Sequence, residues 1–495
     1  MARATVVGSG PNGLAAAVSL ARAGYAVRVL EASRTIGGGV RTAELTLPGF
    51  RHDVGSAVHP AAVASPFFRA FGLDRRLEWL RRDIAYAHPL DDGRAGIAWH
   101  DLERTARGLG ADAGAWRALL RPLSRNIEGV VDLTGASLLR MPRHPLTAGR
   151  FALRVLEQGT RMAARTFRGE EAAALLAGVV AHANTPLPSL SGAAAGMLLA
   201  AHAHAGGWAL PRGGAQAIAD ALADDLRAHG GAIETDAGVD DLRTLDWGDP
   251  ARGDLLLLNT APRLMLTLPD LPSGYARALR RHRYGPAAAK VDFALDGPIP
   301  WSNPLVARAP TVHLGGTREE VWASENAVAS GRVSERPYVL AVQPSVLDET
   351  RAPAGKAVLW SYIHVPHGSE LDATELVTRQ VERFAPGFRD LVLASRAVRA
   401  SEREAINPSD VGGDILAGAF TMRQAVQRPT LSPAPWRTPV RGVYLASAAT
   451  PPGPGVNGMA GWLAARTALA DAGERVALAD VFGGDHLRKT RSLGS

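Results

Sequence analysis

The chain has 495 residues, which is too many for one ordinary hydrophobic core and enough for two or three domains. Apolar residues make up 46% and charged residues 21%, a balance that excludes a disordered chain, a collagen-like repeat and a coiled coil. Although Lys and Arg number 55, the net charge is only +7, so the composition predicts no nucleic-acid partner.

The sequence contains no cysteine, which excludes disulfides, thiolate metal sites and flavin attached through a Cys sulfur. Redox chemistry would therefore need a bound cofactor. His202 and His204 have no partners at metal-ligand spacing, so we expect no metal. The first residues carry no leader pattern, and the uncharged stretch 185–211 holds three prolines. We expect a cytoplasmic protein without a membrane span.

Residues 4–31 have the pattern of a β-α-β unit that binds a dinucleotide. An apolar strand (4–7) runs into Gly8-x-Gly10-x-x-Gly13, a helix follows to residue 23, and a second strand (26–30) ends at Glu31. The glycines allow a tight turn and close approach of a pyrophosphate, and Glu31 can accept both ribose hydroxyls. The predicted contacts are Gly8, Gly10, Pro11, Asn12, Gly13, Glu31 and Ala32. The motif alone is compatible with NAD and with FAD.

Later segments alternate between helical and strand patterns. Residues 100–205 and 213–229 have helical patterns, and 254–259 (DLLLLN) is typical of a buried parallel strand. Strands at 288–295 and 356–365 suggest a different sheet, and a strand (442–447) and helix (458–472) end the pattern. We predict an α/β fold with a doubly wound, Rossmann-like domain of discontinuous segments, an inserted α+β substrate domain and a helical cap. The expected boundaries are 1–88, 205–262 and 436–485 for the nucleotide-binding domain, 89–204 for the cap, and 263–435 for the substrate domain.

Six segments, in order along nearly the whole chain, resemble the phytoene desaturase-like FAD oxidoreductases of the amine-oxidase and desaturase superfamily. They are VVGSGPNGLAAAVSLARAGYAVRVLEAS, IGGGVRTAELTLPGFRHDVGSAVHP, LPRGGAQAIADALADDLRAHGG, DLLLLNTAP, AAAKVDFALDGPIPW and GVYLASAATPPGPGVNGMAGWLAA. The resemblance implies non-covalent FAD. It also implies cofactor contacts at Gly38, Gly39, Arg41, Thr42, Ser56, Val239, Ser447, Gly455, Val456 and Asn457.

The sequence departs from this family's pattern at three of its glycine-rich positions. Gly39 stands where an Arg often follows the glycine pair, and Arg41 is the candidate substitute. Pro454 replaces a Gly, and Asn457 replaces a frequent His. We still expect the glycine-rich turn ending at Val456-Asn457-Gly458 to present backbone amides and a positive helix end to the flavin and so to stabilise its reduced form.

The resemblance implies transfer of a hydride from a substrate C–H to flavin N5. The implied reaction desaturates an apolar or polyene-like small molecule. No second glycine-rich unit is present for NAD(P)H, so we expect O2 or a quinone as electron acceptor. Three alternatives remain open: a flavin amine or imine oxidase, a redox-neutral isomerase, and a non-catalytic FAD-binding protein.

Three residues are candidates for catalysis, each with a structural alternative. Lys290 resembles the family's lysine that holds a water at flavin N5, and it is one of only three lysines; the alternative is a surface side chain beside a strand. His364 alternates with Trp360 and Tyr362 on one strand face and lines either a cavity or the core. Asp414 resembles a residue near the substrate end of the flavin, but it could equally cap a turn.

Residues 150–168 suggest a peripheral membrane contact. On a helix, Arg150, Arg154, Arg161, Arg165 and Arg168 fall within about 60° of one another. Phe151, Val155 and Met162 form an adjoining apolar stripe that could rest on anionic lipid. The alternative is a solvated charged face.

Overall fold

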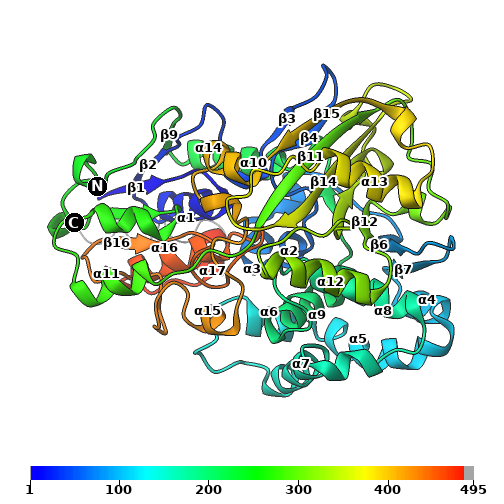
Figure 1. Cartoon of the computed structure of the whole chain (residues 1–495). Coiled ribbons are helices and arrows are strands. Elements are labelled where there is room, and N and C mark those ends of the chain that lie inside the picture. The colour runs from blue at the N-terminus through cyan, green and yellow to red at the C-terminus, as the bar shows by residue number, and fades with distance from the viewer. Residues whose placement is uncertain (1, 484–495) are drawn as a thin grey trace.

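In the computed structural model, which describes residues 2–483, the first β-α-β unit lies at the centre of a wholly parallel sheet (Figure 1). Every neighbouring pair in this sheet is parallel, and the two strands that flank the central strand lie more than 200 residues apart in the sequence. The predicted strands at 4–7, 26–30, 254–259 and 442–447 are all present in it. In spatial order the strands are β16 (Val443–Leu445), β10 (Leu255–Leu258), β1 (Arg3–Val7), β2 (Ala26–Leu30) and β9 (Ala232–Glu234).

Small side chains allow three helices to pack closely on one face of this sheet. α1 (Pro11–Arg22) contacts both α10 (Gln216–Ala228) and α16 (Met459–Asp471). A Cβ at Gly461 would lie only 1.8 Å from the carbonyl oxygen of Asn12, so α16 can approach the start of α1 only with glycine there. The opposite face is covered by residues 242–279, including α11 (Ser273–Arg280). The parallel sheet covered on both faces is the predicted doubly wound fold.

A seven-stranded mixed sheet forms the second large layer. All neighbours are antiparallel except β12 and β6, and its longest strands, β11 and β14, cross the upper right of Figure 1. One face packs against helices of the region 100–205, and the other packs against α13 (Thr374–Phe384). The strand order is β15 (Val392–Val398), β11 (Ala287–Leu295), β14 (Ala357–Val365), β13 (Val339–Val342), β12 (Thr311–Leu314), β6 (Ile84–Pro89) and β7 (Ala95–Trp99).

Two strands of this sheet lie outside the range 263–435 expected to form the substrate domain. β6 falls within the range expected for the nucleotide-binding domain and β7 within the helical cap, yet both extend the second sheet through β12. β6 buries Tyr86 in the core on one face of the sheet and Ile84 and Ala87 in the core on the other, with a register irregularity between Ile84 and Tyr86. A pairing partner more than 200 residues away cannot be seen in a local pattern.

The predicted helical region is present below the second sheet in Figure 1. Its helices are α4 (Leu102–Gly108), α5 (Ala113–Ser124), α6 (Ile127–Thr134), α7 (Pro145–Gln158), α8 (Glu170–Ala181) and α9 (Leu190–Ala205). Further short elements are β3 (Thr42–Glu44), β4 (Arg51–Asp53), β5 (Trp79–Leu80), β8 (Leu210–Pro211), α2 (Pro60–Ala64), α3 (Pro66–Phe71), α12 (Arg318–Ala329), α14 (Arg403–Ile406), α15 (Met422–Val426) and α17 (Leu478–Phe482). Within residues 2–483, no helix has the length and apolar character needed to cross a bilayer.

Residues 150–168 do not form one continuous helix, which is the condition under which the five arginines would share one face. α7 ends at Gln158, and a separate 3-10 turn (Arg161–Arg165) follows Gly159. Phe151 and Val155 are buried in the core rather than forming an outer stripe. A Cβ at Gly159, the C-cap of α7, would lie 2.7 Å from Cα of Leu190, so only glycine fits where this helix ends.

Candidate functional site

A cavity of about 680 Å³ extends from the carboxyl edge of the parallel sheet to one face of the second sheet. This edge is where the strand order of a doubly wound sheet opens a crevice for a ligand. Most of the predicted cofactor contacts line it: Gly8, Gly10, Pro11, Asn12, Glu31, Ala32, Gly38, Gly39, Arg41, Ser56, Val239, Ser447, Gly455 and Val456. The substrate-side wall is formed by Ala57, Val58, His182, Ala288, Lys290, Leu340, Trp360, Tyr362, Ile415 and Leu416.

The glycine turn has the conformation that a bound pyrophosphate requires. Gly8 has a φ of +93°, and a Cβ at Gly13 would lie 2.0 Å from the carbonyl oxygen of Gly8. Gly13 therefore allows α1 to pack against the turn, as expected, and lies beside the cavity rather than on its wall. A Cβ at Gly39 would meet nothing within 4 Å, so this position opens onto the cavity.

Glu31 is held in one orientation at the end of β2. One carboxylate oxygen accepts hydrogen bonds from the backbone N–H and hydroxyl of Ser9, and the other accepts from the N–H of Ser33 at 2.9 Å. The side chain is buried but lines the cavity. Its remaining lone pairs can accept from ribose hydroxyls without any side-chain rearrangement.

These residues fit a dinucleotide. The first turn of α1 has no acidic residue and no side-chain cap, so its N–H groups and positive end are available to phosphates. The buried Oδ1 of Asn12 has no protein hydrogen-bond partner. Within residues 2–483 no cluster of His, Asp and Glu has the geometry of a metal site.

Two of the predicted contacts have structural roles instead. The Thr42 hydroxyl donates to Asp53 at 2.7 Å and accepts from the N–H of Gln216 at 3.1 Å. Asn457 Oδ1 accepts from the N–H of Met459 at 2.9 Å, so it caps α16 and occupies one of the amides expected to face the flavin. Neither side chain lines the large cavity.

Arg41 lies beside the glycine pair but points partly away from it. Its guanidinium donates to the carbonyls of Gly38 at 3.0 Å and Ile406 at 2.6 Å, and to the Ser33 hydroxyl at 3.2 Å. Burial lowers its pKa. The side chain lines the cavity and also braces the 33–41 loop. That Arg41 substitutes for the arginine absent at position 39 stays a prediction.

Asn259 is a site residue that the sequence analysis did not identify. Its Nδ2 donates to the carbonyl oxygen of Gly8 at 3.2 Å, and it lines the cavity. The signal was available, because Asn259 directly follows the apolar strand β10. A polar residue at the carboxyl end of a central parallel strand lies at the ligand edge.

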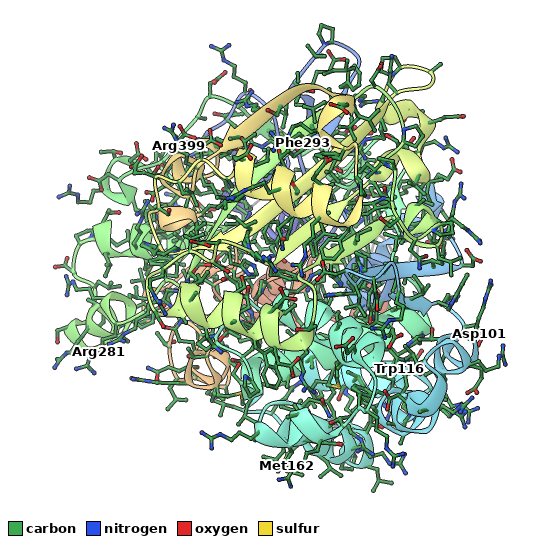
Figure 2. The ribbon with its side chains drawn as sticks, turned by 45° about the vertical axis from the view of Figure 1, so that its right-hand side comes forward. Asp101, Trp116, Met162, Arg281, Phe293 and Arg399 are labelled. Carbon is green, nitrogen blue, oxygen red and sulfur yellow. The ribbon has the colours of Figure 1, made fainter. Side chains whose placement is uncertain are left out.

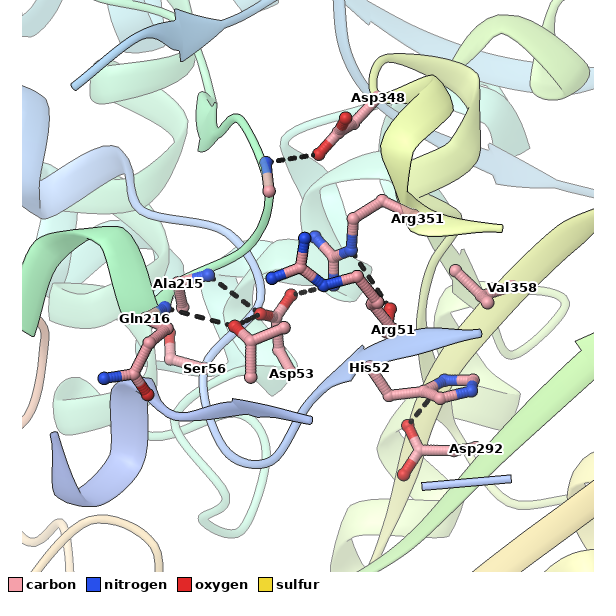
Figure 3. A network of polar contacts seen from close by, with 12 residues as sticks. Arg51, His52, Asp53, Ser56, Ala215, Gln216, Asp292, Asp348, Arg351 and Val358 are labelled. Carbon is pink, nitrogen blue, oxygen red and sulfur yellow. Dashed lines mark hydrogen bonds and ion pairs between the residues drawn. The ribbon is translucent and has the colours of Figure 1, made fainter. Parts of the chain in front are cut away.

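A buried charge network joins three distant segments behind the cofactor loop (Figure 3). The Arg351 guanidinium donates to Asp53 at 2.7 Å, and both side chains are at most 1% exposed. Asp53 also accepts from the N–H of Ala215 at 2.8 Å and from Thr42. Burial alone would raise the pKa of Asp53, but Arg351 and these donors hold it below its usual range.

Lys290 lies on the substrate side of the cavity and forms an ion pair with Asp292. Both side chains point to the same face of β11, two residues apart, and both are nearly inaccessible. Burial lowers the pKa of Lys290 and raises the pKa of Asp292. The ring of His52 lies 3.6 Å from the second oxygen of Asp292, and burial lowers the His52 pKa to about 3 (Figure 3). Both shifts bring the neutral forms of the two side chains closer in energy to the ion pair, which is the condition for holding or releasing a proton at Nζ.

The other two catalytic candidates do not reach the cavity. His364 Nδ1 is hydrogen-bonded to the Glu325 carboxyl group at 2.8 Å and is 2% exposed; its ring packs against Tyr362, which lines the cavity. Asp414 accepts from the N–H groups of Gly285, Leu416 and Gly418 at 2.7, 2.8 and 2.9 Å. This is the arrangement of a turn-capping aspartate.

A different histidine reaches the cavity at the end of α8. His182 lines the wall, and its Nε2 is 2.8 Å from Nε2 of the buried His313. Burial lowers the pKa of His182 to about 3 and that of His313 well below its ordinary value. Two neutral imidazoles sharing one hydrogen bond leave Nδ1 of His182 for a ligand. No local motif marks His182, because its partner is 131 residues away.

The fold and this cavity define a flavin-dependent oxidoreductase class. Residues 12–469 match the family model described as flavin containing amine oxidoreductase, and the chain belongs to this family. The chain is 27% identical to pyridine nucleotide-disulfide oxidoreductase domain-containing protein 2 of Rattus norvegicus, over 94% of this chain and 93% of that protein. It is also 27% identical to a zeta-carotene-forming phytoene desaturase of Myxococcus xanthus, over 92% and 91%.

Solved structures agree with this assignment of the fold. Cyclohexylamine oxidase from Brevibacterium oxydans aligns with a TM-score of 0.57 at 16% identity, over 96% of this chain and all of that one. The predicted resemblance, the Rossmann-like fold and FAD as cofactor are therefore confirmed.

Replacing Glu31 with Gln is expected to weaken FAD binding by about ten- to a hundredfold. The substitution removes the charge that strengthens hydrogen bonds to the ribose, and such charge-assisted bonds contribute about 1.5–3 kcal/mol. Titration of the FAD-free protein with FAD measures the dissociation constant. Glu234→Gln, on an exposed side chain of the neighbouring strand β9, is the matched control. Equal affinity of both variants would remove Glu31 from the cofactor site.

Proposed function

We propose that the protein oxidises an apolar small molecule by removing hydrogen from a substrate carbon, leaving a new double bond. The observation that carries this proposal is the composition of the substrate-side wall. Ala57, Val58, Ala288, Leu340 and Ile415 surround it, with the aromatic rings of Trp360 and Tyr362. Walls of this kind bind ligands by apolar contact and exclude water.

Bound FAD would supply the two-electron acceptor for this chemistry. The chain would orient the reacting carbon against the apolar wall. The buried Lys290–Asp292 pair is suited to holding a proton or a water at Nζ, because its two pKa shifts bring the neutral and ionised states closer in energy. The final electron acceptor, O2 or a quinone, is part of the proposal.

The amine oxidase alternative is less well supported by the charges of the wall. The carboxylates that line the cavity are Glu31, Asp240 and Asp410. Glu31 lies at the end of β2, and Asp410 is paired with Arg403 at 3.0 Å. The substrate side has Lys290 and His182 instead, and a protonated amine would have no counter-ion there.

Anaerobic mixing tests the proposal directly. The FAD-loaded protein is mixed separately with polyenes, with amines and with NAD(P)H, and the visible flavin absorbance is followed. We expect bleaching by an apolar polyene-like compound and none by NAD(P)H. Bleaching by amines alone would establish the oxidase alternative. No bleaching by any compound would favour an isomerase or a binding protein.

His182 is predicted to select substrates that carry an oxygen at the end of the molecule nearest α8. His182→Phe should lower kcat/KM about tenfold for an apolar substrate with a hydroxyl or carbonyl group, and leave an all-hydrocarbon analogue unchanged. A single neutral hydrogen bond contributes about 0.5–1.5 kcal/mol, which corresponds to that factor. The ring stays neutral above its lowered pKa of about 3, so the preference should not vary between pH 5 and 8.

Steady-state kinetics with the two substrates measures this difference. Tyr338→Phe is the control, because it removes a buried hydrogen bond to the carbonyl of Gly178 without altering the cavity wall. Equal losses for both substrates would show that His182 acts only through packing.

A further inference from the structure

Exposed apolar side chains are concentrated in one short part of the chain. Ten large hydrophobic residues are exposed among those described, and seven of them lie between residues 138 and 162. The most exposed of these seven are Met141 at 87%, Leu146 at 78% and Met162 at 59%. Figure 2 shows Met162 at the lower edge of the molecule, among the helices and far from Phe293 in the second sheet. A cluster of exposed apolar side chains on a protein surface indicates an interaction site.

The geometry of α7 explains why these side chains remain outside. Leu146, Leu153 and Leu156 fall within about 80° of one another at 100° per residue. Phe151 and Val155 point the other way and fill the core against α5 and α9. The helix therefore has two apolar faces, of which the protein buries one.

The charge around the outer face is strongly positive. Residues 138–168 contain seven arginines and one acidic residue, Glu157. Glu157 is paired with Arg154 at 2.6 Å. Arg150, Arg161, Arg165 and Arg168 are exposed, and within residues 2–483 none of them forms an ion pair. They are therefore available to an anionic partner.

We propose that this surface docks on an anionic lipid bilayer. The "α7 surface" comprises Met141, Leu146, Leu153, Leu156 and Met162 with Arg150, Arg161, Arg165 and Arg168. Its leucines and methionines would enter the boundary between headgroups and acyl chains, and its arginines would contact lipid phosphates. This inference does not depend on the proposed substrate.

A second copy of the chain fits the same surface poorly. A two-fold dimer through α7 would bring the four unpaired arginines of this surface in one chain toward the same four in the other. Such an arrangement repels, whereas an anionic bilayer complements both the apolar and the charged parts of the surface.

Vesicle sedimentation with the full-length, FAD-loaded protein tests the proposal. Phosphatidylcholine vesicles with and without phosphatidylglycerol are compared at low and high salt. We expect the protein to sediment with the anionic vesicles and to be partly released by salt. The variant Leu146→Ser, Leu153→Ser, Leu156→Ser should bind at least tenfold more weakly. The variant that carries Arg150→Gln, Arg161→Gln and Arg165→Gln together should lose the preference for anionic lipid.

The matched control replaces three exposed hydrophobic residues elsewhere: Leu393→Ser, Met422→Ser and Leu431→Ser. This variant should bind vesicles like the unmodified protein. Flavin absorbance and thermal unfolding check that every variant is folded and loaded. Absence of binding to anionic vesicles, or equal binding by the leucine variant, would overturn the proposal. So would a solution dimer that the leucine variant converts to a monomer, because the surface would then belong to a second copy.

Discussion

Lys290→Met is expected to lower turnover by a hundredfold or more while FAD remains bound. Positioned acid–base groups typically contribute factors of 10² to 10⁴, and Lys290 is the one lysine that lines the cavity in the part of the chain that the structure describes. Single-turnover absorbance of the flavin measures its reduction and reoxidation separately. Unchanged rates for both steps, with FAD retained, would remove Lys290 from the mechanism.

The same substitution leaves Asp292 buried without its main partner. Removing one partner of a buried pair usually destabilises a protein by about 3–5 kcal/mol, so lost activity alone could reflect poor folding. The matched variant is Lys290→Met with Asp292→Asn, which removes both charges. We expect this double variant to regain most of the stability and none of the turnover. Recovery of turnover would show that the pair has only a structural role.

Arg351→Met is expected to give the largest loss of stability, about 3–5 kcal/mol in the free energy of unfolding. The substitution leaves the Asp53 carboxylate buried without its counter-ion. It also removes the hydrogen bond of 3.0 Å from Arg351 to the carbonyl of Arg51, which holds the β3–β4 hairpin (Figure 3). Urea unfolding followed by tryptophan fluorescence measures the difference.

A matched control comes from an ion pair on the surface. Arg389 and Glu375 are 53% and 62% exposed, and Arg389→Met should cost less than about 1 kcal/mol because solvent screens the pair. Arg351→Met with Asp53→Asn should recover part of the loss. Equal effects of Arg351→Met and Arg389→Met would contradict the assignment of the buried network.

The dependence of the free energy of unfolding on pH is an independent test of this buried network. The pKa of Asp53 is lower in the folded protein than its ordinary value of about 4. Its contribution is therefore complete above pH 4 and is lost as the pH falls through the lower, folded-state pKa. In the Arg351→Met variant, no positive charge opposes the effect of burial on the pKa of Asp53, so this pKa is no longer lowered. The loss of stability at acid pH that depends on Asp53 should therefore disappear.

The predicted cofactor contacts that line the cavity include those whose chemistry is encoded by neighbouring residues. The turn from Gly8 to Gly13 and the carboxylate of Glu31 lie within one β-α-β unit, so their spacing specifies their geometry. Asp414 is the opposite case, in which the sequence leaves a substrate contact and a turn cap equally open. Its three donors come from both sides of a gap of more than 100 residues, at 285 and at 416–418, and no local pattern distinguishes such a cap from a group that contacts substrate.

The sequence by itself determined the parallel sheet, the FAD-binding turn and the family, because glycine spacing and apolar strand patterns act within one folding unit. Only the tertiary structure decided which side chains meet across the chain. It brought Arg351 to Asp53, His182 to His313 and Asn259 to Gly8. It also turned Phe151 inward and left Leu153 outside. These outcomes depend on which distant elements cover a given face, and burial of that face is a property of the whole fold.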